Sequence, residues 1–247
     1  MASLTPEVIG YIRGIPITNS LVNTVFVDAV ILSAIFFLKR YFRKVPRLFQ
    51  NIVELLIETF YRFIESVSHD HAQKIFPFVM TFFLYILIAN WSGLLPGVTS
   101  IGFFHEGKHG KELVPIMRNA TSDLNVTFAL AFISLVTTHV FSIQTLGIKQ
   151  YVSRFLSFNP IYLFVGILEI VSEITKIISL SFRLFGNIFA GEVVLLTISS
   201  LFAFIVPIPF LLLEILVGLV QALVFSVLTM AFMSILMTKH SEEHAKS

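Results

Sequence analysis

Residues 169–192 read EIVSEITKIISLSFRLFGNIFAGE and lie inside an apolar segment, 161–199. A helix needs roughly 20 apolar residues to cross a bilayer, so this segment is long enough. Its polar side chains nevertheless recur at steps of three or four residues, which places them on one face of a helix: Glu169, Ser172, Lys176, Ser179, Arg183 and Asn187. Lipid cannot satisfy such a face, so the segment predicts a membrane helix whose polar side meets protein or water.

The composition of the whole chain is also typical of a membrane protein. Of the 247 residues, 56% are hydrophobic, and the mean hydropathy of +0.88 is too high for an ordinary soluble domain. The chain has no cysteine, no Gly-rich phosphate loop, no H-E-x-x-H motif and no basic patch with interleaved aromatics. We therefore expect no cofactor, no metal site and no nucleic-acid partner.

The apolar segments predict one all-α membrane domain over 1–247, with about five transmembrane helices and one amphipathic helix. The expected transmembrane helices are 20–38, 75–95, 125–147, 161–199 and 207–237. Segment 48–67 has one charged face and one apolar face, so it is expected to lie in the interface or against partner helices. The last two segments exceed the roughly 20 residues of a perpendicular span. They are therefore expected to tilt strongly or to run partly outside the core, and to form a hairpin.

Basic residues indicate the orientation in the membrane. Five of them follow the first span directly: Lys39, Arg40, Arg43, Lys44 and Arg47. The positive-inside rule puts this segment in the cytoplasm and the amino terminus outside. Alternation then places a polar loop, 96–123, outside, and the polar carboxyl end in the cytoplasm.

Arg183 is the least expected residue for a membrane helix. It lies about 22 residues, or roughly 33 Å, into its segment, which is too deep for its side chain to reach a helix end. A central arginine costs at least about 2.5–3.5 kcal/mol and stays charged. A functional partner outside the chain is one explanation, and a structural ion pair with a glutamate of the same bundle is the other.

Two glutamates of the expected hairpin lie at one level. Glu192 comes nine residues after Arg183, so it points to the opposite side of the helix. With the hairpin centred near residue 203, Glu192 lies level with Glu214, and Arg183 with Gln221. Two carboxyls held out of bulk water are expected to share a proton. Gly186 and Ala190 form a small-xxx-small pair that admits another helix or packs the hairpin itself.

Two polar residues of other spans have a simpler interpretation. Asp28 is expected at the outer end of its span or against another helix, and it carries no assigned role. His139 is interpreted as a hydrogen-bonded packing residue rather than as a ligand.

The segment SFRLFGNIFAGE, residues 181–192, resembles the signature of subunit a of rotary F-type ATP synthases. Three further motifs support the resemblance: EILVGLVQ at 214–221, ANWSGLLP at 89–96 and DLNVT at 123–127. The order of the segments agrees as well, and the resemblance covers nearly the whole chain. It implies that the long hairpin lies against a ring of c subunits, with ATP chemistry on other subunits.

The resemblance also implies roles for single residues. Arg183 matches the arginine that faces the c ring, with Asn187, Gly186 and Ala190 at the same rotor interface. The half-channel open to the outside matches Glu192, Glu214, Gln221 and Asn90. The half-channel open to the cytoplasm matches Glu169, Ser172, Lys176 and Ser179. The implied partners are the c ring, the peripheral-stalk b subunits, the rest of the complex and the lipid bilayer.

Two other functions fit parts of the sequence. A secondary transporter with an Arg–Glu site would carry an internal repeat, and none is visible. A structural membrane anchor would keep proton transport after Arg183→Ala. The expected location is a bacterial plasma membrane, because the short amino-terminal segment lacks a transit peptide, with an organelle membrane as the alternative.

Overall fold

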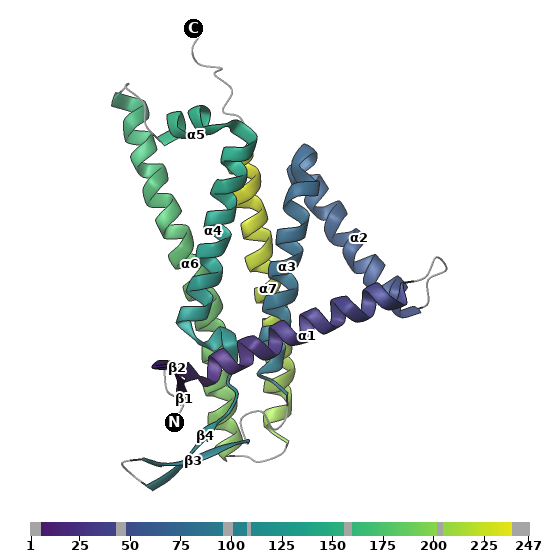
Figure 1. Cartoon of the computed structure of the whole chain (residues 1–247), viewed down its shortest axis with the longest axis vertical. Helices are drawn as coiled ribbons and strands as arrows, with labels where there is room; N and C mark the ends of the chain where they lie inside the picture. Colours follow the sequence, from purple (N-terminus) through teal and green to yellow (C-terminus); the bar gives the residue numbers. More distant parts are fainter. Residues whose placement is uncertain are drawn as a thin grey trace.

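The computed structural model describes residues 6–42, 48–95, 101–107, 110–155, 160–201 and 205–238. Most of them are helical, which confirms the predicted all-α membrane class (Figure 1). The α-helices are α1 (Asn19–Tyr41), α2 (Leu48–Ser68), α3 (Ala72–Ser92), α4 (Leu124–Leu146), α5 (Ile148–Phe155), α6 (Pro160–Leu201) and α7 (Pro207–Met237). The 3-10 helices η1 (His69–His71) and η2 (Ala120–Ser122) precede α3 and α4.

Two small antiparallel hairpins complete the described structure. Strands β1 (Val8–Ile12) and β2 (Ile15–Thr18) pair before α1. Strands β3 (Gly102–Gly107) and β4 (Gly110–Pro115) pair within the segment that we expected to be a polar loop. Neither hairpin nor the short helix α5 was predicted, because each is too short to show a clear hydrophobic period.

Four helices in the described ranges are long and apolar enough to cross a membrane, over 19–40, 72–92, 124–146 and 207–237. They coincide with four of the five expected spans. The fifth, α6, is one continuous helix of 42 residues. At 1.5 Å per residue it is roughly 63 Å long, about twice the thickness of the hydrocarbon core. In a bilayer, α6 must therefore tilt strongly or extend beyond the hydrocarbon core.

Local sequence signals fix the ends of several helices. Thr18 caps α1 by accepting a hydrogen bond from the backbone N–H of Leu21, and Asp123 caps α4 in the same way through Asn125. Gly147, with φ of 81°, ends α4 in a conformation that favours glycine. Pro207 begins α7, where its missing N–H costs nothing.

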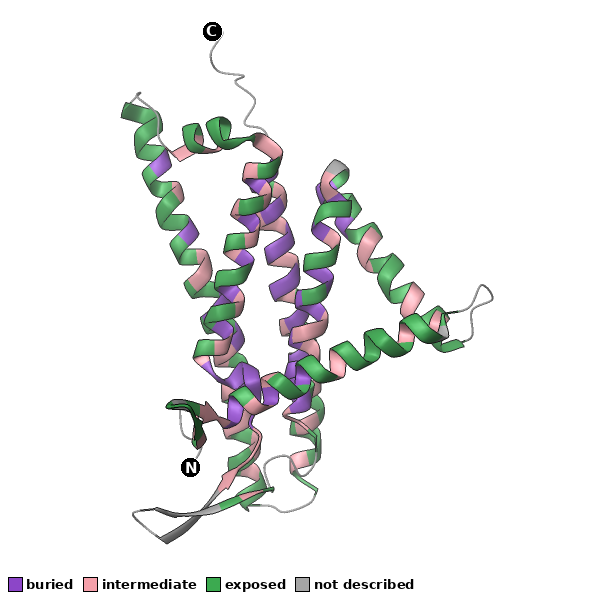
Figure 2. Cartoon of the chain, viewed as in Figure 1, coloured by how far each residue is buried: buried purple, intermediate pink, exposed green. Residues whose placement is uncertain are grey.

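Helices α3, α4, α6 and α7 run side by side, and α1 lies across their direction (Figure 1). Buried side chains gather where these four helices face one another, while α1, α2 and the outer side of α6 are mostly exposed (Figure 2). The central apolar cluster includes Phe82, Phe83, Ile86, Leu184, Ile188 and Phe225. The exposed apolar faces are those that a bilayer covers, since lipid is as apolar as these side chains.

Candidate functional site

Helix α6 has one exposed face and one buried face. The exposed face carries Ser172, Ser179, Arg183, Asn187 and Ala190. The buried face packs against α4 and α7, and its members are Glu173, Leu180, Ser181, Leu184 and Ile188. The polar stripe predicted from the sequence is therefore divided, because Glu169 and Lys176 lie between the two faces and are only partly exposed.

Arg183 lies on the exposed face, where its Nη2 donates a hydrogen bond to Oγ of Ser179 at 3.2 Å. The structural ion pair considered above is not formed: within the described residues, no carboxylate lies within 4.0 Å of the guanidinium. Of the five charged residues of α6, Arg183 alone lacks an ion-pair partner within the described chain.

The small residues next to Arg183 lie on the same open face. A Cβ added at Gly186 would meet nothing within 4 Å, and Ala190 is exposed. They do not serve to pack α6 against α7, which was one of the two interpretations of this pair. The face is instead flat enough for a helix of another chain to approach.

At one end of the hairpin, Glu192 of α6 and Glu214 of α7 line a single cavity of about 270 Å³. Glu214 is only 5% exposed, and its carboxyl packs over Gly191, where an added Cβ would lie 1.9 Å from Oε2 of Glu214. A larger residue at position 191 would force the Glu214 carboxyl to move. The structure thus brings together the two carboxyls that the hairpin register placed at one level.

A buried arginine, which was not predicted, lies beside Glu192. Nε of Arg118 lies 3.3 Å from Oε1 of Glu192, with 7% and 17% of the two side chains exposed. The guanidinium also lies 5.8 Å from the ring centre of Phe189. In the sequence, nothing distinguishes Arg118 from Lys108 and Lys111 of the same segment. Glu192 therefore has a cation beside it, and the expectation that Glu192 and Glu214 share one proton stays a prediction.

Polar contacts with the start of α1 hold the segment that carries Arg118. The backbone N–H of Arg118 donates to the carbonyl of Asn19 at 3.4 Å. Ser20 donates to a carboxylate oxygen of Asp123 at 2.6 Å, and Ser92 donates to Asn23 at 3.1 Å. Buried polar groups need such partners, so these bonds fix α1 against η2 and α3.

Asn90 braces three elements and does not line the cavity. It is 1% exposed; its amide donates to the carbonyl of Gly218 at 2.9 Å and accepts from the hydroxyl of Thr121 at 2.6 Å. Asn119, which was not singled out, lines the cavity instead. Gln221 is partly buried on α7, two turns from Glu214 and about 10.5 Å closer to the level of Arg183.

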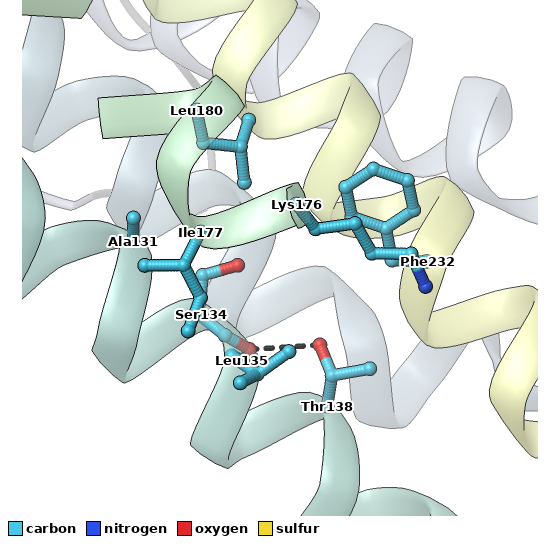
Figure 3. A pocket seen from close by; sticks show the side chains of 8 residues that line it. All are labelled: Ala131, Ser134, Leu135, Thr138, Lys176, Ile177, Leu180 and Phe232. Atoms are coloured by element: carbon cyan, nitrogen blue, oxygen red, sulfur yellow. Dashed lines mark hydrogen bonds between the residues drawn. The ribbon is translucent and has the colours of Figure 1, made fainter. Parts of the chain in front are cut away.

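The other end of α6 carries a second cluster of charges. Glu169 forms an ion pair with Arg154 of α5. Lys176 forms another with Glu173, at 2.7 Å from Nζ to Oε1, and its Nζ lies 4.7 Å from the ring centre of Phe232 (Figure 3). Ser172, predicted for the same path, is exposed on the face of Arg183. Two of the four residues predicted here, Glu169 and Lys176, therefore meet charged partners.

Glu173 and His139 belong to this second cluster, although Glu173 was missed and His139 was interpreted as a packing residue. Nε2 of His139 lies 3.8 Å from Oε2 of Glu173, and its Nδ1 shares a hydrogen bond of 2.9 Å with the hydroxyl of Tyr151. A signal for Glu173 existed in the sequence, since it follows Glu169 by four residues and therefore lies near it on the helix.

Comparisons with known proteins agree with this arrangement. A family profile described as ATP synthase A chain matches residues 21–234. A protein of Moorella thermoacetica named ATP synthase subunit a is 31% identical, over 95% of this chain and 97% of its own. One of Legionella pneumophila with the same name is 31% identical over 90% and 88%. A protein of Bradyrhizobium named ATP synthase subunit a 2 is 33% identical over 93% of both chains. The chain therefore belongs to the ATP synthase subunit a family.

Proposed function

We propose that this chain is the proton-conducting stator subunit of an F-type ATP synthase in a bacterial plasma membrane. The observation that carries the proposal is Arg183, a permanent charge on the open face of α6 without a carboxylate partner in the described chain. A cluster of ionisable residues lies on each side of Arg183 along α6. Glu192 lies about 13.5 Å from Arg183 in one direction, and Glu169 lies about 21 Å from it in the other.

The open face of Arg183 needs a partner that comes from outside the chain. An arginine exposed to lipid is costly, and a carboxylate on the c ring offsets that cost by pairing with it. Gly186 and Ala190 leave room beside Arg183 for a ring helix. Arg183 is thus the stator arginine, and the exposed face of α6 is the rotor interface.

The cavity near the hairpin turn supplies the outer half-channel. Glu192 pairs with Arg118, whereas Glu214 has no ion-pair partner among the described residues, so Glu214 is the carboxyl that takes up and passes on a proton. Gln221 continues this path toward the level of Arg183. Asn90 supports the path indirectly, because it holds α3, η2 and α7 together.

The two half-channels give proton flow a direction. A proton that enters past Glu214 neutralises a c-ring carboxylate, which can then enter lipid as the ring turns. After nearly a full turn, the carboxyl meets the cytoplasmic half-channel near Glu169 and Lys176 and loses its proton. Arg183 favours the ionised form between the two paths and prevents a direct leak. Each proton supplies about 2.3 kcal/mol per 100 mV.

The remaining roles follow from membership of the complex. Nucleotide chemistry belongs to other subunits of the synthase, and the peripheral-stalk b subunits hold this chain against the turning ring. Helix α2 has exposed apolar side chains next to the charged pair Glu58–Arg62, which suits the membrane surface. The amino terminus faces outward, and the carboxyl terminus faces the cytoplasm.

Arg183→Ala tests the proposal in the whole complex reconstituted into vesicles. ATP-driven proton pumping, followed with a pH-sensitive dye, is expected to be lost while the complex still assembles. Arg62→Ala removes another exposed arginine, at 75% side-chain exposure, and serves as the matched control with normal pumping. Full pumping by an assembled Arg183→Ala complex would contradict the proposal and favour a structural anchor.

A further inference from the structure

Glu173 is a buried carboxylate that the proposed function does not yet use. It is 6% exposed on the face of α6 that meets α4. Its Oε1 accepts a hydrogen bond from Lys176 at 2.7 Å, but its Oε2 has no hydrogen-bond partner among the described residues. A buried carboxylate oxygen without a partner is costly, so its presence calls for a reason other than stability.

The group nearest to this oxygen is an imidazole that reaches toward the surface. Nε2 of His139 lies 3.8 Å away, and 21% of the His139 side chain is exposed, against 8% for Glu173. The hydroxyl of Tyr151 holds Nδ1 of the same ring at 2.9 Å. Burial, followed by the charges of Glu173 and Glu169, raises the pKa of Tyr151, which keeps this hydroxyl protonated. His139 is thus oriented with one nitrogen toward Glu173.

The positive and negative charges around Glu173 and His139 nearly cancel. From α6, Lys176 pairs with Glu173, and Glu169 pairs with Arg154 of α5. From α7, Phe232 faces Lys176, and the carbonyl of Ile235 accepts from Arg154 at 3.5 Å. Glu173 therefore pairs with the ammonium group of Lys176. Glu169 pairs with the guanidinium of Arg154, which cannot release a proton.

Packing beside Lys176 leaves little space for a continuous water path inside the bundle. In Figure 3, Lys176 of α6 points toward Phe232 of α7. The small cavity there is also lined by Ile177 and Leu180 of α6 and by Ser134 and Thr138 of α4. The cavity that they line with Phe232 has a volume of about 10 Å³, the lower limit for a single water molecule. At this cavity, side chains are better placed than a chain of waters to carry a proton.

We propose that Glu173 and His139 form a proton relay that completes the cytoplasmic half-channel, an inference that rests on the proposed function. The Glu173 carboxylate takes the proton released by the c ring and passes it to Nε2 of a neutral His139 that is protonated at Nδ1 and donates to the Tyr151 oxygen. The imidazolium then loses the same proton from Nε2 to water, which restores both groups. No bond other than these N–H and O–H bonds forms or breaks.

The test uses the intact synthase in vesicles whose catalytic part faces the medium. Glu173→Gln and His139→Gln keep the size of each side chain but remove its titration. Each is expected to lower ATP-driven pumping and passive proton flux at least about tenfold, a modest share of what a positioned acid or base contributes. The double variant is expected to be no slower than either single variant, because both residues serve one relay.

Two further readouts separate a relay from a packing role. Wild-type flux is expected to change with the pH of the medium in the range where imidazole titrates, and His139→Gln is expected to remove that step. Imidazole added to the medium is expected to restore part of the flux of His139→Ala, since the site is partly exposed. His71→Gln, a histidine before α3, is the matched control and is expected to behave as wild type.

The outcomes of this test are distinct from those of the Arg183 experiment. Unchanged flux and an unchanged pH profile in His139→Gln overturn the relay, even where Arg183→Ala abolishes pumping and the proposed function stands. Additive losses in the double variant also overturn it. If Glu173→Gln fails to assemble, the flux, pH profile and imidazole response of the His139 variants decide the question alone.

Discussion

Arg183 differs from the other charged side chains of α6 in its surroundings. Glu169, Glu173, Lys176 and Glu192 each have an oppositely charged partner from the chain itself. Surface pairs such as Glu58–Arg62 contribute little to stability, but a buried pair is different, because removing one partner strands a charge. At the scale of single residues, partners therefore decide which charges hold the fold and which remain available to a second protein.

Arg118→Gln tests this distinction at the outer cavity. It leaves the Glu192 carboxylate without its cation, which is expected to destabilise the assembled subunit by about 3–5 kcal/mol, as for other broken buried pairs. The uncompensated charge also repels the carboxylate form of Glu214, so the pH profile of pumping is expected to move to higher pH. Pumping by reconstituted complexes at a series of external pH values measures the shift.

Two companion variants make the result specific to charge. Arg118→Lys keeps the cation and is expected to retain most of the activity. Adding Glu192→Gln to Arg118→Gln removes the stranded carboxylate, so part of the stability and the original pH profile are expected to return. A pH profile that stays the same in Arg118→Gln would show that Arg118 does not act on the two glutamates.

At the scale of elements, α6 works because its two sides have different tasks. Its buried side packs against α4 and α7, and its open side presents Arg183 with small residues around it. A helix whose every side served the bundle could not offer a polar face to a neighbour. The periodicity of the sequence predicted the polar face, but only the packing showed which of its members are open.

Ala190→Leu tests the open side of α6. The added side chain is expected to change the stability of the isolated subunit by no more than about 0.5 kcal/mol, because Ala190 is exposed. It is expected to obstruct a helix that approaches Arg183, so the c ring should co-purify less and pumping should fall. Ala34→Leu, the same change at an exposed position of α1, is the control. Equal c-ring recovery and pumping in both variants would argue against this interface.

At the scale of the whole molecule, the direction of α1 constrains how the protein lies in the membrane. Helix α1 has 23 residues and is about 34 Å long, which suits a bilayer core of about 30 Å. Since α1 lies across α3, α4, α6 and α7 (Figure 1), these four helices and α1 cannot all be perpendicular to the membrane. The length of α6 is compatible with such a tilt, and we infer that the bundle is tilted.

Spin labels measure this tilt, and the natural chain has no cysteine that would interfere. Labels at Leu32 and Phe36 of α1 and at Leu212 and Leu223 of α7 occupy exposed positions. Depth in the bilayer is expected to change by about 1.5 Å per residue along α1, the full rise of a perpendicular helix, and by clearly less along α7. A slope of about 1.5 Å per residue along α7 would rule out a tilted bundle.

Much of this protein is determined by its sequence, because the relevant signals are local. Apolar length defines the membrane helices, helical period defines the polar face of α6, and the hairpin register places Glu192 level with Glu214. These features depend on residues that are near one another in the chain or related by one short turn. The same holds for the motif around Arg183, from which the family could be identified.

Only the tertiary structure decided which residues complete the site. Arg118 reaches Glu192 from 74 positions away, and His139 reaches Glu173 from 34. Asn90, predicted for the half-channel, joins α3, η2 and α7 through its hydrogen bonds. A helical period records which residues share a face, but it does not record which face of another helix they meet. Only the packing of α4, α6, α7 and the segment before η2 therefore shows which residue pairs with each charged side chain.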